Sequence, residues 1–149
     1  MSSQHHPSSS IGNNIPEVLD SLREARSGIV TADDYVKYGF RCQVHGEPKI
    51  DPFEVLDRRT TRFMGKGAAW NYIAALEAIE NAGLEDKDYK QNPRTGIIMG
   101  SGGPSTKAVV EAAQTTVERG PKRIGPLVVP KAMSSTASAT LATPLQIHG

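Results

Sequence analysis

The segment 95–99 restricts most strongly what this 149-residue chain can fold into. It reads Thr-Gly-Ile-Ile-Met, and two adjacent isoleucines without polar alternation are typical of a strand buried on both faces of a parallel sheet. Such a strand needs neighbours on both edges, because each buried backbone N–H and C=O requires a hydrogen-bond partner. No other run is as clear a strand, so we expect an α/β fold of which this chain supplies only a part.

Apolar spacing predicts a first helix well before this strand. It should cover 16–27, with Pro16 in its first turn and Gly28 as a left-handed stop. The following segment, 29–51, is punctuated by prolines and is predicted as a loop that could hold a short strand at 41–45.

The longest helix is predicted over 62–82, where alanines accompany one apolar stripe and Gly83 closes the pattern. Another helix should begin near Ser105, and a third, built from small residues, should cover 132–141 ahead of Pro144. Three prolines between these two helices predict a loop.

Composition excludes several classes of protein. Lysine and arginine number 17 against 16 acidic residues, a net charge of +1 that argues against a nucleic-acid binder. One cysteine excludes a disulfide framework, and the sequence indicates no metal site and no cofactor. Without a run of about 20 apolar residues or an apolar signal core, we expect no membrane association and a cytoplasmic location. Residues 1–10 are polar and serine-rich, which predicts a disordered lead.

The glycine-rich turn after the predicted strand leaves one alternative open. Gly100-Ser101-Gly102 stands between a strand and a helix, as in a dinucleotide-binding fingerprint, but the third glycine position is Ser105 and no P-loop lysine follows. Glycines here more readily let another group lie against the backbone. A nucleotide-binding domain would be stabilised against heat by a dinucleotide.

Cys42 is the one candidate nucleophile within the chain, and His45 stands three residues away. Residues three apart in a strand point to opposite faces, so the imidazole would not reach the thiol. We therefore interpret Cys42 as a structural thiol. No Ser-His-Asp set, carboxylate pair or zinc-binding helix can be assembled either.

Two basic clusters indicate an anionic partner. Arg58, Arg59 and Arg62 stand where a helix is expected to begin, and positive charge there opposes the helix dipole. Arginines in an unfavourable place favour contact with phosphate or with an acidic protein surface. Lys122 and Arg123 form the second cluster.

Five long strings, in order, resemble the N-terminal part of bacterial β-ketoacyl-acyl-carrier-protein synthases. They cover nearly all of 10–149, and the strings KAM and LATPLQIHG are most similar to the type I elongating synthase. The strings are SIGNNIPEVLDSLREARSGI, LDRRTTRFMGKGAAW, ALEAIENAGL, YKQNPRTGIIMGSGG and GPLVVPKAMSSTASATLATPLQIHG.

The resemblance implies a thiolase-like fold, in which two related layered α/β halves share one chain and the chain forms a homodimer. It implies a cysteine that accepts an acyl group from acyl carrier protein and condenses it with malonyl-carrier protein, releasing carbon dioxide. That cysteine and two assisting histidines lie beyond the last matching string. We therefore expect 11–149 to be a partial ketosynthase N-terminal domain, without the first strand and the C-terminal half, and inactive alone.

The resemblance also implies roles by position. Gly103 matches a glycine that lines the acyl pocket, while Val129 and Met133 match positions near the dimer seam. The two basic clusters match the surface that receives the acidic acyl carrier protein. The alternative is a non-catalytic fragment that serves dimerisation or carrier-protein binding.

Overall fold

The computed structural model describes residues 9–103 and 105–148. The chain divides into two compact units, Met1–Asp51 and Pro52–Gly149, and each is described by itself. Most of the predicted disordered lead, residues 1–10, lies outside the described residues. Its last two residues are described, and Ser9 pairs with Gly12 in an isolated antiparallel bridge.

The first unit opens with α1 (Ile15–Arg23), and Pro16 stands in its first turn as predicted. The Asn14 side chain caps the helix by accepting a hydrogen bond from the Glu17 amide at 2.8 Å. The predicted end at Ser27 is wrong, because the chain turns earlier, where Ala25 adopts the left-handed region with a φ of 51°.

Gly28 is needed for close packing and not as the left-handed stop. A Cβ added at Gly28 would lie 2.1 Å from the carbonyl oxygen of Ser10. Only glycine therefore lets the segment around Ser10 pass so near the backbone.

The predicted loop of the first unit contains a small hairpin. Strands β1 (Ile29–Thr31) and β2 (Val44–Gly46) pair antiparallel, with Val30 opposite His45. Helix α2 (Asp33–Lys37) lies between them in the sequence. The strand expected at 41–45 thus exists but begins at Val44.

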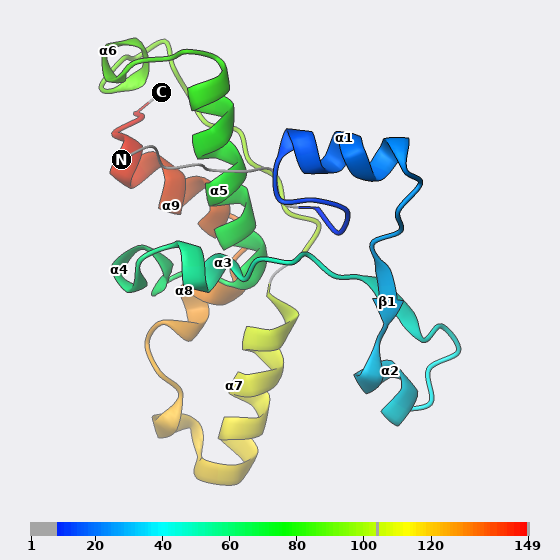
Figure 1. Ribbon diagram of the computed structural model, residues 1–149. Coiled ribbons are helices and arrows are strands. Elements are labelled where there is room, and N and C mark those ends of the chain that lie inside the picture. Colours follow the sequence, from blue (N-terminus) through cyan, green and yellow to red (C-terminus); the bar gives the residue numbers. More distant parts are fainter. Residues whose placement is uncertain (1–8, 104, 149) are drawn as a thin grey trace. The chain divides into compact units, whose positions relative to one another are not determined.

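The second unit is built on two helices that pack together, α5 (Lys66–Asn81) and α9 (Thr136–Leu145) (Figure 1). Their contact forms the centre of the core, together with residues just before α5 and in α6; the buried members are Met64, Ala69, Tyr72, Tyr89, Leu141 and Leu145. The remaining elements are α3 (Pro52–Val55), α4 (Arg58–Thr61), α6 (Asp86–Tyr89), α7 (Thr106–Arg119), the 3-10 helix η1 (Pro121–Arg123) and α8 (Val128–Ala132).

Helix boundaries in this unit differ from the prediction at two places. The helix expected from Arg62 begins at Lys66, because Gly65 is extended and separates it from α4. The helix expected over 132–141 is displaced to α9, which runs through Pro144. The start of α7 is as predicted, and the Ser105 hydroxyl caps it by accepting from the Ala108 amide.

The strand predicted at 95–99 is not formed. Within the described residues the only sheet is the β1–β2 hairpin of the first unit. Ile98 is 101% exposed, whereas Ile97 and Met99 rest against the core, and the Met99 carbonyl accepts a hydrogen bond from the Ser138 hydroxyl at 3.2 Å. The apolar sequence alone does not make a strand here, because no described segment lies beside it to pair with its backbone.

Every helix among the described residues is too short or too polar to cross a bilayer.

Candidate functional site

Asp57 organises the arginine-bearing helix α4. Its carboxylate accepts hydrogen bonds from the backbone amides of Arg59 at 2.8 Å and Thr60 at 2.9 Å, and from the Thr60 hydroxyl at 2.5 Å. These bonds hold the pKa of Asp57 below its ordinary value, and the bond from the Thr60 hydroxyl has the largest effect. The carboxylate thus supplies the negative charge that a helix start prefers, and it offsets the two arginines placed there.

Sequence reasoning missed Asp57, although a signal was present. Aspartate is among the preferred residues at the position before a helix, where its oxygen accepts from the second and third amides. The run Asp-Arg-Arg-Thr-Thr therefore identifies the start of α4, a separate short helix that the apolar pattern did not predict.

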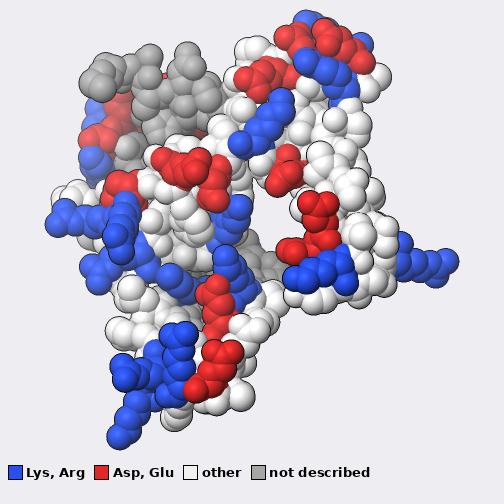
Figure 2. Space-filling model, turned by 60° about the horizontal axis from the view of Figure 1, so that its bottom comes forward, with Lys and Arg blue, Asp and Glu red and all other residues white. Residues whose placement is uncertain are grey.

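The three arginines of this region are exposed and available to a partner. None of Arg58, Arg59 and Arg62 forms an ion pair with a residue that the structure describes. The Arg62 guanidinium instead lies 4.7 Å from the centre of the Phe63 ring. Figure 2 shows basic and acidic side chains interspersed over the visible face, with a larger basic group at its lower left.

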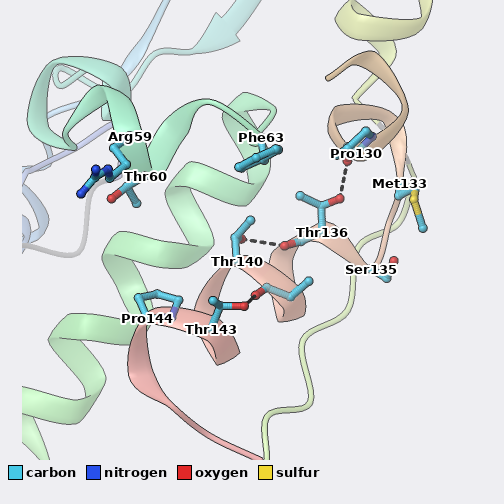
Figure 3. Close-up of a pocket in the computed structure, with 11 residues that line it drawn as sticks. Arg59, Thr60, Phe63, Pro130, Met133, Ser135, Thr136, Thr140, Thr143 and Pro144 are labelled. Atoms are coloured by element: carbon cyan, nitrogen blue, oxygen red, sulfur yellow. Dashed lines mark hydrogen bonds between the residues drawn. The ribbon is translucent and has the colours of Figure 1, made fainter. Parts of the chain in front are cut away.

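A large cavity, here called the α4–α9 pocket, lies between these two helices and α8. Its volume is about 530 Å³, and Arg59 is its one charged lining residue among those described. In Figure 3 the side chains of α9 face Arg59, Thr60 and Phe63 across the cavity. The lining residues are Arg59, Thr60, Phe63, Pro130, Met133, Ser135, Thr136, Ala139, Thr140, Thr143 and Pro144.

The threonines of α9 contribute little polarity to this pocket. The Thr140 hydroxyl donates to the Thr136 carbonyl at 2.6 Å, and the Thr143 hydroxyl donates to the Ala139 carbonyl at 3.0 Å. The Thr136 hydroxyl donates to the carbonyl of Pro130 (Figure 3). Because these hydroxyl protons are already used, the wall suits an apolar group.

A second cavity of about 140 Å³, here called the Gly65 pocket, is lined by the starts of α5 and α9 and by the cap of α7. Gly65 lies so near Ser105 that an added Cβ would stand 2.7 Å from the serine Cβ. The lining residues are Gly65, Gly67, Ala68, Asn71, Ser101, Gly103, Ser105, Lys131, Met133, Ser134, Thr136 and Ala137.

The structure brings some of the sequence-predicted residues together. Gly103 and Met133 line the Gly65 pocket, and Met133 also lines the α4–α9 pocket, to which Arg59 contributes from the other side (Figure 3). Val129 lies in α8 with 66% of its surface exposed and lines neither pocket.

The other four basic residues that the sequence singles out lie outside both cavities. Arg58 lies in α4 and Arg62 directly follows it. Lys122 and Arg123 form the exposed 3-10 helix that follows α7. The second basic cluster is thus carried by a different element from the first.

The residues considered for nucleophilic catalysis, nucleotide binding and metal binding do not form such sites among the described residues. Cys42 is exposed, and its thiol donates to the Val44 carbonyl at 3.6 Å instead of to an imidazole. Around Gly100 and Gly102 an added Cβ would meet no atom within 4 Å. Among the described residues no three histidine, cysteine, aspartate or glutamate side chains gather as metal ligands do.

Comparison with solved structures identifies the class of fold. The ishigamide ketosynthase/chain length factor superposes with a TM-score of 0.77 at 23% identity, over 93% of this chain and 35% of that chain. A beta-ketoacyl synthase from Burkholderia phymatum STM815 gives 0.74 at 18% identity, over 94% and 35%. The predicted fold class, a partial thiolase-like α/β fold, is confirmed.

Sequence comparison identifies the family. The protein-family model described as "Beta-ketoacyl synthase, N-terminal domain" matches residues 8–149. The chain therefore belongs to this family, as the resemblance predicted. Over 142 residues the chain is 46% identical to 3-oxoacyl-[acyl-carrier-protein] synthase 1 of Escherichia coli (strain K12), and 45% identical to the protein of that name from Haemophilus influenzae (strain ATCC 51907 / DSM 11121 / KW20 / Rd). Each match covers 95% of this chain but 35% of the relative, so the chain spans about a third of their length.

Proposed function

We propose that the chain is the N-terminal part of a type I 3-oxoacyl-acyl-carrier-protein synthase, which elongates acyl chains in fatty acid biosynthesis. The observation that carries this proposal is the 46% identity with the E. coli synthase 1 over 142 residues. The site supports it, because an apolar cavity of about 530 Å³ beside exposed arginines suits an acyl-transfer enzyme that receives an acidic carrier protein.

In the proposed reaction an acyl group is held as a thioester on a cysteine. Decarboxylation of malonyl-carrier protein leaves a carbanion that attacks the thioester carbonyl, so that a carbon–carbon bond forms, the thiolate leaves and carbon dioxide is released. Cys42 is not that cysteine, since it is exposed and has no base beside it. The chemistry is assigned to the two thirds of the relatives that this chain does not match.

The described residues would bind and position the substrates. Gly103 would line the acyl pocket, and Val129 and Met133 would lie near the seam of a homodimer. The arginines around α4 would receive the carrier protein, with Lys122 and Arg123 as a second contact. A cytoplasmic location remains a prediction of the sequence.

A chimera tests the proposal. Residues 8–149 replace the matching third of the E. coli synthase 1, and condensation with malonyl-carrier protein is measured. We expect activity, and we expect the same activity when the chimera carries Cys42→Ser. A folded chimera that binds acyl carrier protein but makes no carbon–carbon bond would contradict the proposal.

A second function is favoured by one observation, the three arginines without an ion-pair partner among the described residues. They fit a non-catalytic segment that binds acyl carrier protein or pairs with an intact synthase. Titration of the 149-residue chain with acyl carrier protein, and co-purification with the E. coli synthase, separate this role from catalysis.

A further inference from the structure

We propose that the α4–α9 pocket binds an unesterified fatty acid, with the alkyl chain inside the cavity and the carboxylate on Arg59. The juxtaposition that carries this inference is a single arginine in a mainly apolar wall that is otherwise uncharged among the described residues (Figure 3). The site is separate from the cavity that contains Gly103, the residue that the proposed function places in the acyl pocket. The inference therefore goes beyond the proposed function.

The wall of the pocket suits an alkyl chain. Phe63 and Pro130 line it, together with alanine and threonine side chains of α9. The hydroxyls of Thr136, Thr140 and Thr143 donate to backbone carbonyls, so they offer no proton to a polar ligand. An alkyl chain placed here leaves water without burying an unpaired polar group. The volume of about 530 Å³ is within the range of small-molecule cavities, about 300–1,000 Å³.

The charge at the pocket selects one anionic group. Arg59 is the one charged residue among the described lining residues, and it forms no ion pair with a described residue. The Asp57 carboxylate, directly before α4, instead accepts hydrogen bonds from the amides of α4 and from the Thr60 hydroxyl. Because Arg59 is exposed and also lines the cavity, its guanidinium is available to a carboxylate at the solvent end, which an arginine can hold through two parallel hydrogen bonds.

Other occupants fit this combination less well. The acyl thioester of a substrate has the same chain but no charge, and it leaves Arg59 without a partner. A second copy of the chain seated symmetrically would bring the arginines of the two chains together, and like charges at an interface are repulsive. A fatty acid uses both the charge and the cavity, and each methylene group removed from water should tighten its binding about fourfold.

Met133 connects this site to the neighbouring Gly65 pocket. Met133 and Thr136 line both cavities, so an occupant of one cavity contacts part of the wall of the other. The Met133 side chain is flexible by its chemistry, and 52% of its surface is exposed. We therefore expect its methyl group to change environment when the fatty acid binds, which gives binding at this site a local signature.

The test titrates dodecanoate, below its micellar concentration, into the full 149-residue chain and follows the methionine methyl resonances by NMR. Ala139→Phe fills the cavity, and Ala78→Phe places the same bulk on an exposed position of α5 outside it as the matched control. Arg59→Gln removes the charge in the wall, and Arg58→Gln is its matched control on the same helix outside the cavity. The neutral N-acetylcysteamine thioester of dodecanoate separates the free acid from an acyl group of the substrate kind.

We expect dodecanoate to shift the methyl resonance of Met133 and to leave that of Met64, which is 2% exposed in the core, unchanged. Ala139→Phe and Arg59→Gln should each weaken binding about tenfold, whereas the two controls should change it by less than about twofold. The neutral thioester should bind about tenfold more weakly than the acid, and Arg59→Gln should not weaken it further. Thermal melts establish that each variant is folded, and Thr143→Leu is the blocking variant if Ala139→Phe does not fold.

Each contrary result overturns the inference in a distinct way. Equal binding of the acid and the thioester, unaffected by Arg59→Gln, would assign the pocket to substrate acyl chains. Binding that Ala139→Phe leaves intact would place the fatty acid on another apolar surface, and no binding at all would leave the pocket without this ligand. If sedimentation shows that Ala139→Phe dissociates a homodimer, the occupant is a second copy of the chain. Condensation by the chimera is a separate measurement, so failure here is distinguishable from failure of the proposed function.

Discussion

At the scale of single residues, Asp57 shows how a short helix can carry adjacent arginines. The helix α4 has four residues, too few to be stable by its own hydrogen bonds. Three hydrogen bonds to the Asp57 carboxylate replace what the helix lacks, and they also fix the stretch of backbone that bears Arg58 and Arg59.

Replacing Asp57 separates capping from charge. Asp57→Ala removes a negative charge beside the arginines, which by charge alone would strengthen binding to an acidic carrier protein, but it also removes the cap. We expect weaker binding, since exposed charges are screened while the loss of the cap loosens the backbone that carries the arginines. Asp57→Asn keeps an accepting oxygen and should bind at least as well as the unchanged chain.

The comparison is measured by titration with acyl carrier protein and by amide hydrogen exchange at Arg59 and Thr60. Equal or tighter binding by Asp57→Ala would show that the cap does not position the arginines. Acid provides a further check: the pKa of Asp57 is lowered in the folded chain, so its stabilising effect is complete above the ordinary value of 3.8. That effect is lost as the pH falls through the lower folded value.

At the scale of elements, the start of α5 is fixed by close packing against the cap of α7. Gly65 and Ser105 are forty positions apart in the sequence, yet no side chain fits between them. Gly67, two residues later and inside α5, has open space where a Cβ would lie. A side chain is therefore excluded at Gly65, whereas Gly67 has room for one.

We expect Gly65→Ala to destabilise the chain by about 1–3 kcal/mol, because the added methyl group would overlap Ser105. Gly67→Ala should stabilise it by about 0.4–1 kcal/mol, since the helical backbone accepts alanine and the unfolded chain loses freedom. Urea unfolding of both variants measures the difference. Equal effects of the two substitutions would contradict the packing at this junction.

The sequence predicts elements whose signals are local. The apolar stripe of α5, the start of α7 near Ser105 and Pro16 in the first turn of α1 depend on neighbours a few residues away, and all three are found. The left-handed turn at Ala25 and the contact of Gly28 with Ser10 depend on packing, which residue type alone does not reveal. For the same reason the resemblance predicts Gly103 and Met133 as site residues, while only the structure shows that they line one pocket.

At the scale of the whole molecule, many large apolar side chains are exposed among the described residues. Ile98 is fully exposed, Val117 of α7 is 88% exposed and Leu22 of α1 is 64% exposed. The family spans about three times this length, and its members share the fold of the part matched here. The exposed side chains are therefore consistent with surfaces that further polypeptide covers.

The sequence predicts a buried strand at 95–99, whereas the structure exposes Ile98. Substitution of Ile98 tests this difference in two contexts. In the 149-residue chain its side chain touches water on every side, so Ile98→Lys should leave the melting temperature unchanged and reduce aggregation, as measured by light scattering. Leu141→Lys, at a position 1% exposed in the core, should unfold the chain and serves as the control.

In the chimera with the E. coli synthase, by contrast, Ile98→Lys should lower the yield of folded protein and abolish condensation. There the apolar run 95–99 would find strands on both edges, and a lysine between two sheet faces would be buried without a partner. The measurement is the yield of folded chimera and its condensation rate. A chimera that tolerates lysine at this position as well as the isolated chain does would show that the segment is not a buried strand in either context.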